Sequence, residues 1–179
     1  MLAHRRVLFF VILGIVSGCL SAWLDSGNKF IVPGICFGVA VLIGFQEFRL
    51  KRIVQNSMWV ALSTASYYIA VSLTVQVMAE FITTQLPNIT EQQQFFILFF
   101  IGGIIGATLM LLSLHFLITP LSMKEFFCFV LLGGLLGLSG PIESPLGFPD
   151  SFLQLYVVWQ TGMMLALSLV SQKAISNQT

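Results

Sequence analysis

Charged residues are scarce in this chain. They make up 8% of its 179 residues, whereas hydrophobic residues make up 57%. A water-soluble domain carries about 25% charged residues, so too few charges are present here to cover a globule in water. The mean hydropathy of +0.95 agrees with that deficit. The composition therefore excludes an ordinary soluble domain and predicts a protein whose surface faces mainly lipid.

Basic residues are too few to form a surface for a polyanion. The net charge is +1, and the one short basic cluster is RLKR at residues 49–52. A nucleic-acid groove needs Lys and Arg gathered on one face, so no nucleic-acid partner is expected. Membrane lipids are the expected surroundings of the chain.

Cysteine is also rare, with Cys19, Cys36 and Cys128 as the only three and no CxxC spacing. An odd number without that spacing indicates neither a disulfide framework nor a zinc knuckle. All three lie in apolar runs, which favours buried free thiols. The alternative is a bridge between Cys19 and Cys36, because both would lie near the outer ends of consecutive spans. We expect no metal and no cofactor.

Motifs of common catalytic sites are missing: the chain has no GxSxG, HExxH or P-loop pattern. One stiff, proline-rich segment holds two carboxylates, Glu143 and Asp150, with no histidine or nucleophile motif nearby. This arrangement disfavours acid–base catalysis. We expect that outer loop to line or plug an extracytoplasmic mouth, and we expect the chain not to be an enzyme.

Long apolar runs are what the sequence has in abundance. A helix needs about 20 apolar residues to cross a bilayer core, and none of the runs shows the alternation of a membrane β-barrel. Six runs come close to that length: 7–24, 31–48, 57–82, 95–118, 122–140 and 151–171. We therefore predict an all-α integral membrane protein, a compact bundle of about six transmembrane helices that forms one domain over residues 1–179.

Lys and Arg fall almost entirely on one side of these spans, with only Lys29 on the other. Basic residues are enriched in cytoplasmic loops, so both termini are predicted to be cytoplasmic. The residues on that side are Arg5, Arg6, Arg49, Lys51, Arg52, Lys124 and Lys173. We expect a bacterial cytoplasmic membrane, because only the sequon at residues 88–90, a pattern that often arises by chance, hints at another host.

The first run admits two interpretations. Residues 16–19 (VSGC) follow Arg5, Arg6 and a short apolar stretch, as in a lipoprotein signal that is removed. The alternative is a retained first transmembrane helix, in which Gly14 and Gly18 form a packing surface. Five further spans favour the retained helix.

Glycines recur four residues apart in four of the predicted spans. Close backbone approach is a main source of helix association in lipid, so these pairs predict tight helix packing. The pairs are Gly14 and Gly18, Gly34 and Gly38, Gly102 and Gly106, and Gly133 and Gly137. They would serve either packing inside one bundle or an interface between subunits.

Polar residues at membrane depth are the default functional candidates, because burying them in a bilayer is costly. Four of them, at steps of four residues along the third span, form a polar stripe: Tyr68, Ser72, Gln76 and Glu80. We expect this stripe to face the bundle interior, a water-filled cavity or another subunit. In the sixth span, Trp159 and Gln160 are expected to point inward or to a partner. His115 lacks a second ligand and is expected to be a hydrogen-bonded interface residue.

Three functions are compatible with these features. The first is a transporter or channel for a small solute or ion, with a polar path along the third helix. The second is a non-catalytic membrane subunit, for solute binding or assembly, within a homo-oligomer or a larger membrane complex. The third and least favoured is an intramembrane enzyme that acts on a lipid-linked substrate.

Overall fold

The computed structural model describes residues 2–24, 31–45, 53–85, 88–141 and 151–176. Within these ranges the chain is almost entirely helical and contains no strand. The elements are α1 (Leu2–Leu24), α2 (Ile31–Gly44), α3 (Ile53–Ser72), the π-helix η2 (Leu73–Met78), α4 (Ala79–Gln85), α5 (Glu91–Leu117), α6 (Met123–Gly137) and α7 (Ser151–Ser176). Because α3, η2 and α4 follow one another without a break, they form one long helical segment.

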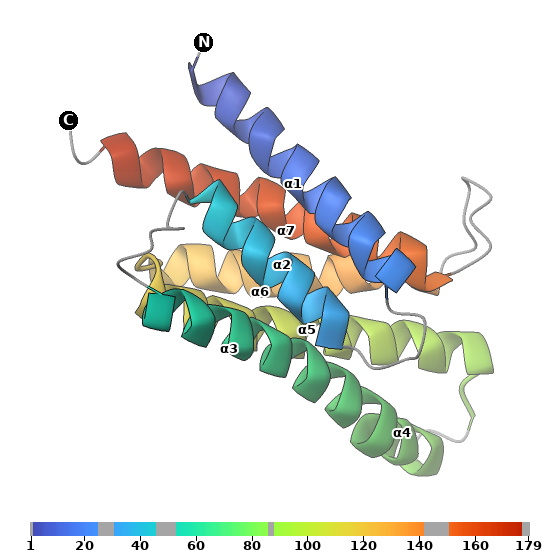
Figure 1. Cartoon of the computed structure of the whole chain (residues 1–179). Coiled ribbons are helices and arrows are strands. Elements are labelled where there is room, and N and C mark those ends of the chain that lie inside the picture. Colours follow the sequence, from blue (N-terminus) through green and yellow to red (C-terminus); the bar gives the residue numbers. More distant parts are fainter. Residues whose placement is uncertain (1, 25–30, 46–52, 86–87, 142–150, 177–179) are drawn as a thin grey trace.

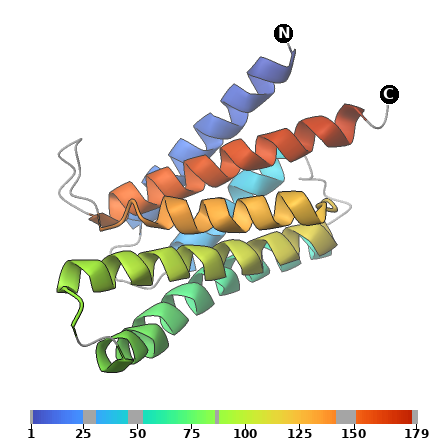
Figure 2. The ribbon, with the colours of Figure 1, turned by 180° about the vertical axis from the view of Figure 1, so that it is seen from behind.

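The helices run up and down beside one another, so that each end of the bundle collects alternate helix ends (Figures 1 and 2). We call the end where α1 begins and α7 ends the proximal end, and the other the distal end. The main pairs are α1 with α7, α5 with α6, α2 with α3, α3 with α5, and α1 with α2. The helices nearest the two chain termini thus pack against each other.

Each predicted span coincides with one described helix or helical segment. Most boundaries agree within about five residues, and the positions predicted after Phe45 in the second span lie outside the described residues. Among the described residues, three helices are long and apolar enough to cross a membrane: His4–Leu24, Ile53–Ile82 and Glu91–Leu117. The helical bundle is therefore confirmed, with three helices that qualify as spans by length and composition.

Local sequence signals explain where two helices begin. Ser122 caps α6: its hydroxyl accepts the backbone N–H of Glu125, whose carboxylate accepts the backbone N–H of Ser122 at 2.8 Å. Thr90 and Gln93 make the same reciprocal pair at the start of α5. Each capping box satisfies donors that a helix start leaves unpaired.

The glycines of α1 and α2 meet the backbones of neighbouring helices. A Cβ atom added at Gly18 would lie 2.5 Å from the Cα of Val157 in α7, which is too close for any side chain. Gly14 faces α7 in the same way, and Gly34 and Gly38 face α3. These two pairs allow α1 and α2 to pack backbone to backbone against their partners.

The glycines of α5 and α6 also face into the bundle. A Cβ atom at Gly137 would lie 2.3 Å from the carbonyl oxygen of Phe99 in α5, and Gly133 is equally close to that helix. Gly102 and Gly106 face the long segment that contains η2 and α3. All four predicted glycine pairs thus lie at contacts between helices of the same chain.

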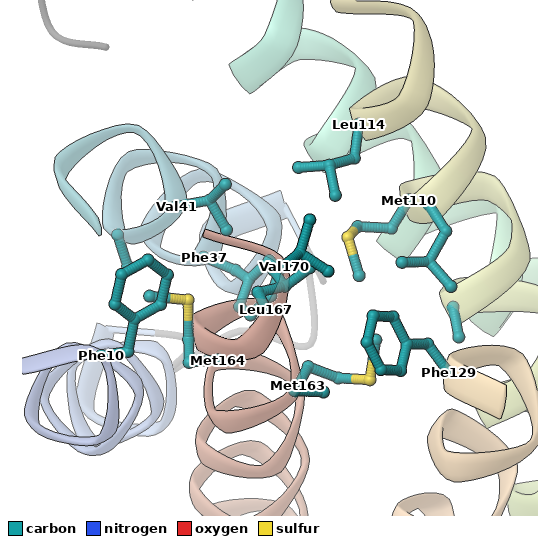
Figure 3. Close-up of a cluster of buried hydrophobic side chains, with 14 of the residues drawn as sticks. Phe10, Phe37, Val41, Met110, Leu114, Phe129, Met163, Met164, Leu167 and Val170 are labelled. Carbon is teal, nitrogen blue, oxygen red and sulfur yellow. The ribbon is translucent and has the colours of Figure 1, made fainter. Parts of the chain in front are cut away.

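The hydrophobic core is concentrated toward the proximal end of the bundle. Side chains from α1, α2, α5, α6 and α7 meet there, and two methionines of α7 lie between aromatic and aliphatic neighbours (Figure 3). The labelled members are Phe10, Phe37, Val41, Met110, Leu114, Phe129, Met163, Met164, Leu167 and Val170. We call this set the proximal core, because its side chains fill the space between the helices in the proximal half of the bundle.

The cysteines differ in part from the prediction. All three are free, so no bridge joins Cys19 and Cys36. Burial was wrongly predicted for Cys19 and Cys128, which are exposed on the outside of the bundle, while Cys36 is partly buried. An apolar run marks a residue that avoids water, and a lipid-facing surface meets that condition as well as a core does.

Candidate functional site: a distal cavity above an aromatic floor

A cavity of about 360 Å³ lies between the long third segment, α5, α6 and α7. Its position is distal, because its walls include residues of η2, the first residue of α4, and residues near the starts of α5 and α7. The lining residues are Tyr67, Ala70, Val71, Thr74, Val75, Ala79, Phe95, Leu98, Phe99, Gly102, Gly103, Gly106, Gly137, Leu155, Tyr156 and Trp159. None of them is charged, and we call this space the distal cavity.

Small residues create the space, and aromatic rings bound it. Gly102 and Gly106 of α5 face the third segment, and Gly103 and Gly137 lie where α5 packs against α6, so backbone forms part of the walls there. Ligand pockets of proteins have volumes of about 300–1,000 Å³, with mainly apolar linings and a few polar groups. The distal cavity meets that description, with hydroxyls of Tyr67, Thr74 and Tyr156 among its lining residues.

Three aromatic residues, one of them Phe37 of the proximal core, lie between the distal cavity and the rest of that core. The ring of Trp159 packs edge-on against Tyr67, with centroids 5.3 Å apart, and against Phe37, with centroids 5.6 Å apart. The indole N–H of Trp159 donates to the carbonyl oxygen of Gly133 at 3.1 Å, which fixes the ring between α7 and α6. We call Phe37, Tyr67 and Trp159 the aromatic floor.

One wall of the cavity is the π-helix η2, which includes Thr74 and Val75. The backbone N–H of Ala79 donates to the carbonyl oxygen of Thr74, five residues earlier, as a π turn requires. The Thr74 hydroxyl is satisfied by the Ala70 carbonyl at 2.6 Å. Single π turns inside α-helices are frequent at functional sites, and this one adjoins the cavity.

A separate polar cluster joins α1, α2 and α7 in the interior. Gln160 is fully buried, and its side-chain oxygen accepts the hydroxyl of Ser17. Its amide nitrogen donates to the hydroxyl of Ser21 at 2.9 Å and to the carbonyl oxygen of Pro33 at 3.5 Å. The amide of Gln160 thus uses both of its donors and its acceptor within the bundle, an arrangement suited to clamping helices together.

Tyr67 lies between the cavity and this cluster. Its hydroxyl is buried close to the Gln160 side chain, but it has no hydrogen-bond partner of normal geometry. A buried hydroxyl without a partner is costly. Tyr67 is therefore a polar group that lies in the cavity wall and also adjoins the Gln160 cluster.

Replacing Gln160 with leucine is expected to lower the free energy of unfolding by about 1–2 kcal/mol, the size of interhelical hydrogen bonds in membranes. The change leaves the Ser17 hydroxyl without its acceptor. Unfolding in mixed detergent micelles measures the effect, in a double-mutant cycle with Ser17→Ala. If the two substitutions act additively, the clamp between α1 and α7 contributes no coupling energy and the prediction is wrong.

The polar stripe does not line the distal cavity. Tyr68 is 55% exposed, Gln76 and Glu80 are exposed, and Ser72 is partly buried. None of the four is among the residues that line the cavity. The structure therefore places the stripe on the outer surface of the bundle, while Trp159 and Gln160 point inward.

The other candidate residues lie away from the cavity. The Nδ1 atom of His115 accepts the backbone N–H of Leu121 at 2.9 Å, so it stabilises the turn between α5 and α6. Among the described residues, no group of histidine, cysteine and acidic side chains could hold a metal ion. Glu143 and Asp150 lie outside the described residues.

The cavity was not predicted from the sequence. The adjacent glycines in α5 (Gly102 and Gly103) and in α6 (Gly133 and Gly134) could have indicated it. Each pair removes side chains from two faces of its helix. Comparisons with known proteins add no assignment: no family model matches the chain, and no curated protein and no solved structure matches it.

Proposed function

We propose that this chain is an integral membrane protein with six spanning helices and both termini in the cytoplasm, and that its distal cavity binds an uncharged, largely apolar small molecule. The cavity carries the proposal. Three helices qualify as spans by themselves. Because α2 packs against α1 and α3, and α6 packs against α5 and α7, a membrane crossed by the long helices would also contain the others.

The charges support this orientation. Arg5, Arg6 and Lys124 belong to the proximal end of the bundle, and Glu91 belongs to the distal end. Cytoplasmic ends carry the excess of Lys and Arg, so the distal cavity would lie in the extracytoplasmic half of the bilayer. The membrane would be a bacterial cytoplasmic membrane, as the sequence predicts.

The chemistry of the lining supports the choice of ligand. No lining residue could neutralise a charged group, and a charge without a partner is costly in such surroundings. Val75 and Phe95 line the cavity and are also exposed on the outside of the bundle. An apolar molecule dissolved in the bilayer could therefore enter past these two side chains without crossing water.

Binding is the function that this geometry supports best, and transport of the bound molecule is its natural extension. The aromatic floor and the proximal core close the cytoplasmic side of the cavity. A single copy in this conformation therefore offers a binding site without a continuous path. A closed binding site agrees with the alternative function, solute binding as part of a larger membrane complex. It does not support the predicted polar path along the third helix.

The binding proposal can be tested by the fluorescence of Trp159 in lipid nanodiscs. A long-chain alcohol that carries bromine on its chain is the probe, because bromine quenches indole fluorescence on contact. With the exposed Trp23 changed to phenylalanine, the remaining Trp59 is fully buried and does not line the cavity, so we expect saturable quenching of the Trp159 contribution above a constant Trp59 signal. The variant Ala79→Phe fills part of the cavity and is expected to weaken probe binding at least about tenfold, since it removes apolar area from the site.

The matched control is Val77→Phe, which adds apolar bulk in the same stretch of helix but on a side chain outside the cavity. Its affinity for the probe should stay unchanged. Quenching that rises linearly without saturation, or that is equally strong in Ala79→Phe, would show that the probe meets Trp159 only from the lipid phase and would refute the proposal.

A further inference from the structure

The outer face of the third helical segment carries an unusual combination of small and polar side chains. A groove of about 850 Å³ runs between α2 and α3, with Ser57, Ala61 and Ala65 at every fourth position on its α3 side. Tyr68 lies at the end of the same groove. Small residues in such a row allow a second helix to approach closely in a membrane.

The π-helix keeps the polar stripe in line with these small residues. In an α-helix of 3.6 residues per turn, positions four apart drift by about 40° at each step. A π turn contains more residues, so a four-residue step falls short of a full turn and reverses the drift. Tyr68, Gln76 and Glu80 consequently stay on the side of the segment that holds Ser57 and Ala61, and all of these are exposed.

In the proposed membrane placement, this face meets hydrocarbon. Tyr68 lies near the middle of the segment Ile53–Gln85, and Gln76 lies about 12 Å farther along the axis. The hydrocarbon core extends about 15 Å from its midplane, so the Gln76 amide would be inside it. Polar groups at that depth almost always face a protein partner or water, and neither is present on the outside of one copy.

We propose that a second copy of this chain covers this face, with the α3 segments of two copies packed against each other in a symmetric dimer. Two copies inserted with the same orientation can be related by a two-fold axis along the membrane normal, which places Gln76 opposite Gln76 at the same depth. A glutamine amide has both donors and an acceptor, so two of them pair reciprocally. Each Gln76 amide would thus provide the hydrogen-bond partner that the Gln76 amide of the other copy lacks.

The contacts within one copy leave the outer face of α3 as the surface that is available to a second copy. The four glycine pairs already lie at contacts within one chain, so they are not available to a partner. The row Ser57, Ala61 and Ala65 is exposed or partly buried, and borders the groove. Isologous two-fold dimers are the commonest oligomers, and this surface has the self-complementary amide that such a contact needs.

Disulfide trapping in membranes tests the dimer. In a background where the three native cysteines are replaced by alanine, Ala61→Cys is expected to give a covalent dimer on mild oxidation, since bridged residues need Cα atoms within about 7 Å. The matched control is Leu131→Cys, exposed on α6 and equally far from the start of its helix. It should stay monomeric.

A second measurement does not depend on cysteine geometry. Single-molecule photobleaching of labelled protein in liposomes should show two copies, and Gln76→Leu should weaken dimerisation about tenfold, the effect of an interhelical hydrogen bond. Val77→Leu is the control. Monomers for the unsubstituted protein, equal trapping at positions 61 and 131, or trapping of Ala61→Cys to a different protein alone would each overturn the proposal. Neither readout uses ligand binding, so the proposed binding function stands or falls by its own test.

Discussion

Replacing Trp159 with alanine is expected to lower the free energy of unfolding by about 3–5 kcal/mol, the usual cost of truncating a large buried aromatic side chain. Trp159 is only 6% exposed, and it belongs both to the buried hydrophobic cluster of the bundle and to the cavity lining. Its removal deletes ring contacts with Tyr67 and Phe37 and frees the carbonyl oxygen of Gly133. The cavity would then extend to the core, because the floor would be missing.

Unfolding in mixed detergent micelles, followed by circular dichroism, measures this change. Trp159→Phe keeps an aromatic ring but loses the hydrogen bond, so about 1 kcal/mol is expected. Trp23→Ala removes a side chain that is 76% exposed and should cost little. If Trp159→Ala is no more destabilising than Trp23→Ala, the aromatic floor does not contribute to the stability of the bundle.

Replacing Gly103 with alanine is the second large effect that we expect. A Cβ atom at Gly103 would lie 2.3 Å from the carbonyl oxygen of Gly133, and that backbone cannot yield without separating α5 from α6. Overpacking of this kind typically costs about 1–3 kcal/mol, and the upper end is expected because backbone meets backbone. Thermal unfolding in detergent measures the loss.

The matched control is Gly106→Ala, on the same helix. Its added Cβ would lie 3.4 Å from the Cβ of Ala70 and 4.0 Å from the ring of Trp159, which are ordinary contacts. Alanine favours a helix over glycine by about 1 kcal/mol, so this variant should be neutral or slightly more stable. Equal behaviour of the two alanine variants would contradict the α5–α6 packing described above.

The sequence was sufficient to predict the helices, because their causes are local. The lengths of the apolar runs determined where the helices lie, and the local capping box of Ser122 and Glu125 sets the start of α6. The π turn was not predictable in this way. Thr74 of this turn packs against Gly102 of α5, a tertiary contact that the spacing of residues in the sequence does not show.

Which residues share one face of a helix was easy to predict, but whether that face meets the bundle interior or the outside was not. The spacing of Tyr68, Gln76 and Glu80 shows that they share a side of one helix, but spacing contains no information about what that side meets. In a soluble protein, the polarity of a helix face would indicate whether it meets water or the core. In a lipid-facing bundle, both the interior and the surface are apolar, so only the packing of neighbouring helices decides it. For the same reason, the distal cavity became visible only when α5, α6 and α7 were placed together.

The pairing of α1 with α7 has a consequence for how the chain is made. Ribosomes deliver the helices in order, so α1 is made long before α7 is synthesised, and contacts between segments far apart in the sequence form late. Until then the Ser17 and Ser21 hydroxyls lack the Gln160 amide that later joins them. The polar contacts of α1 with Gln160 are therefore complete only after α7 has been synthesised and has packed against it.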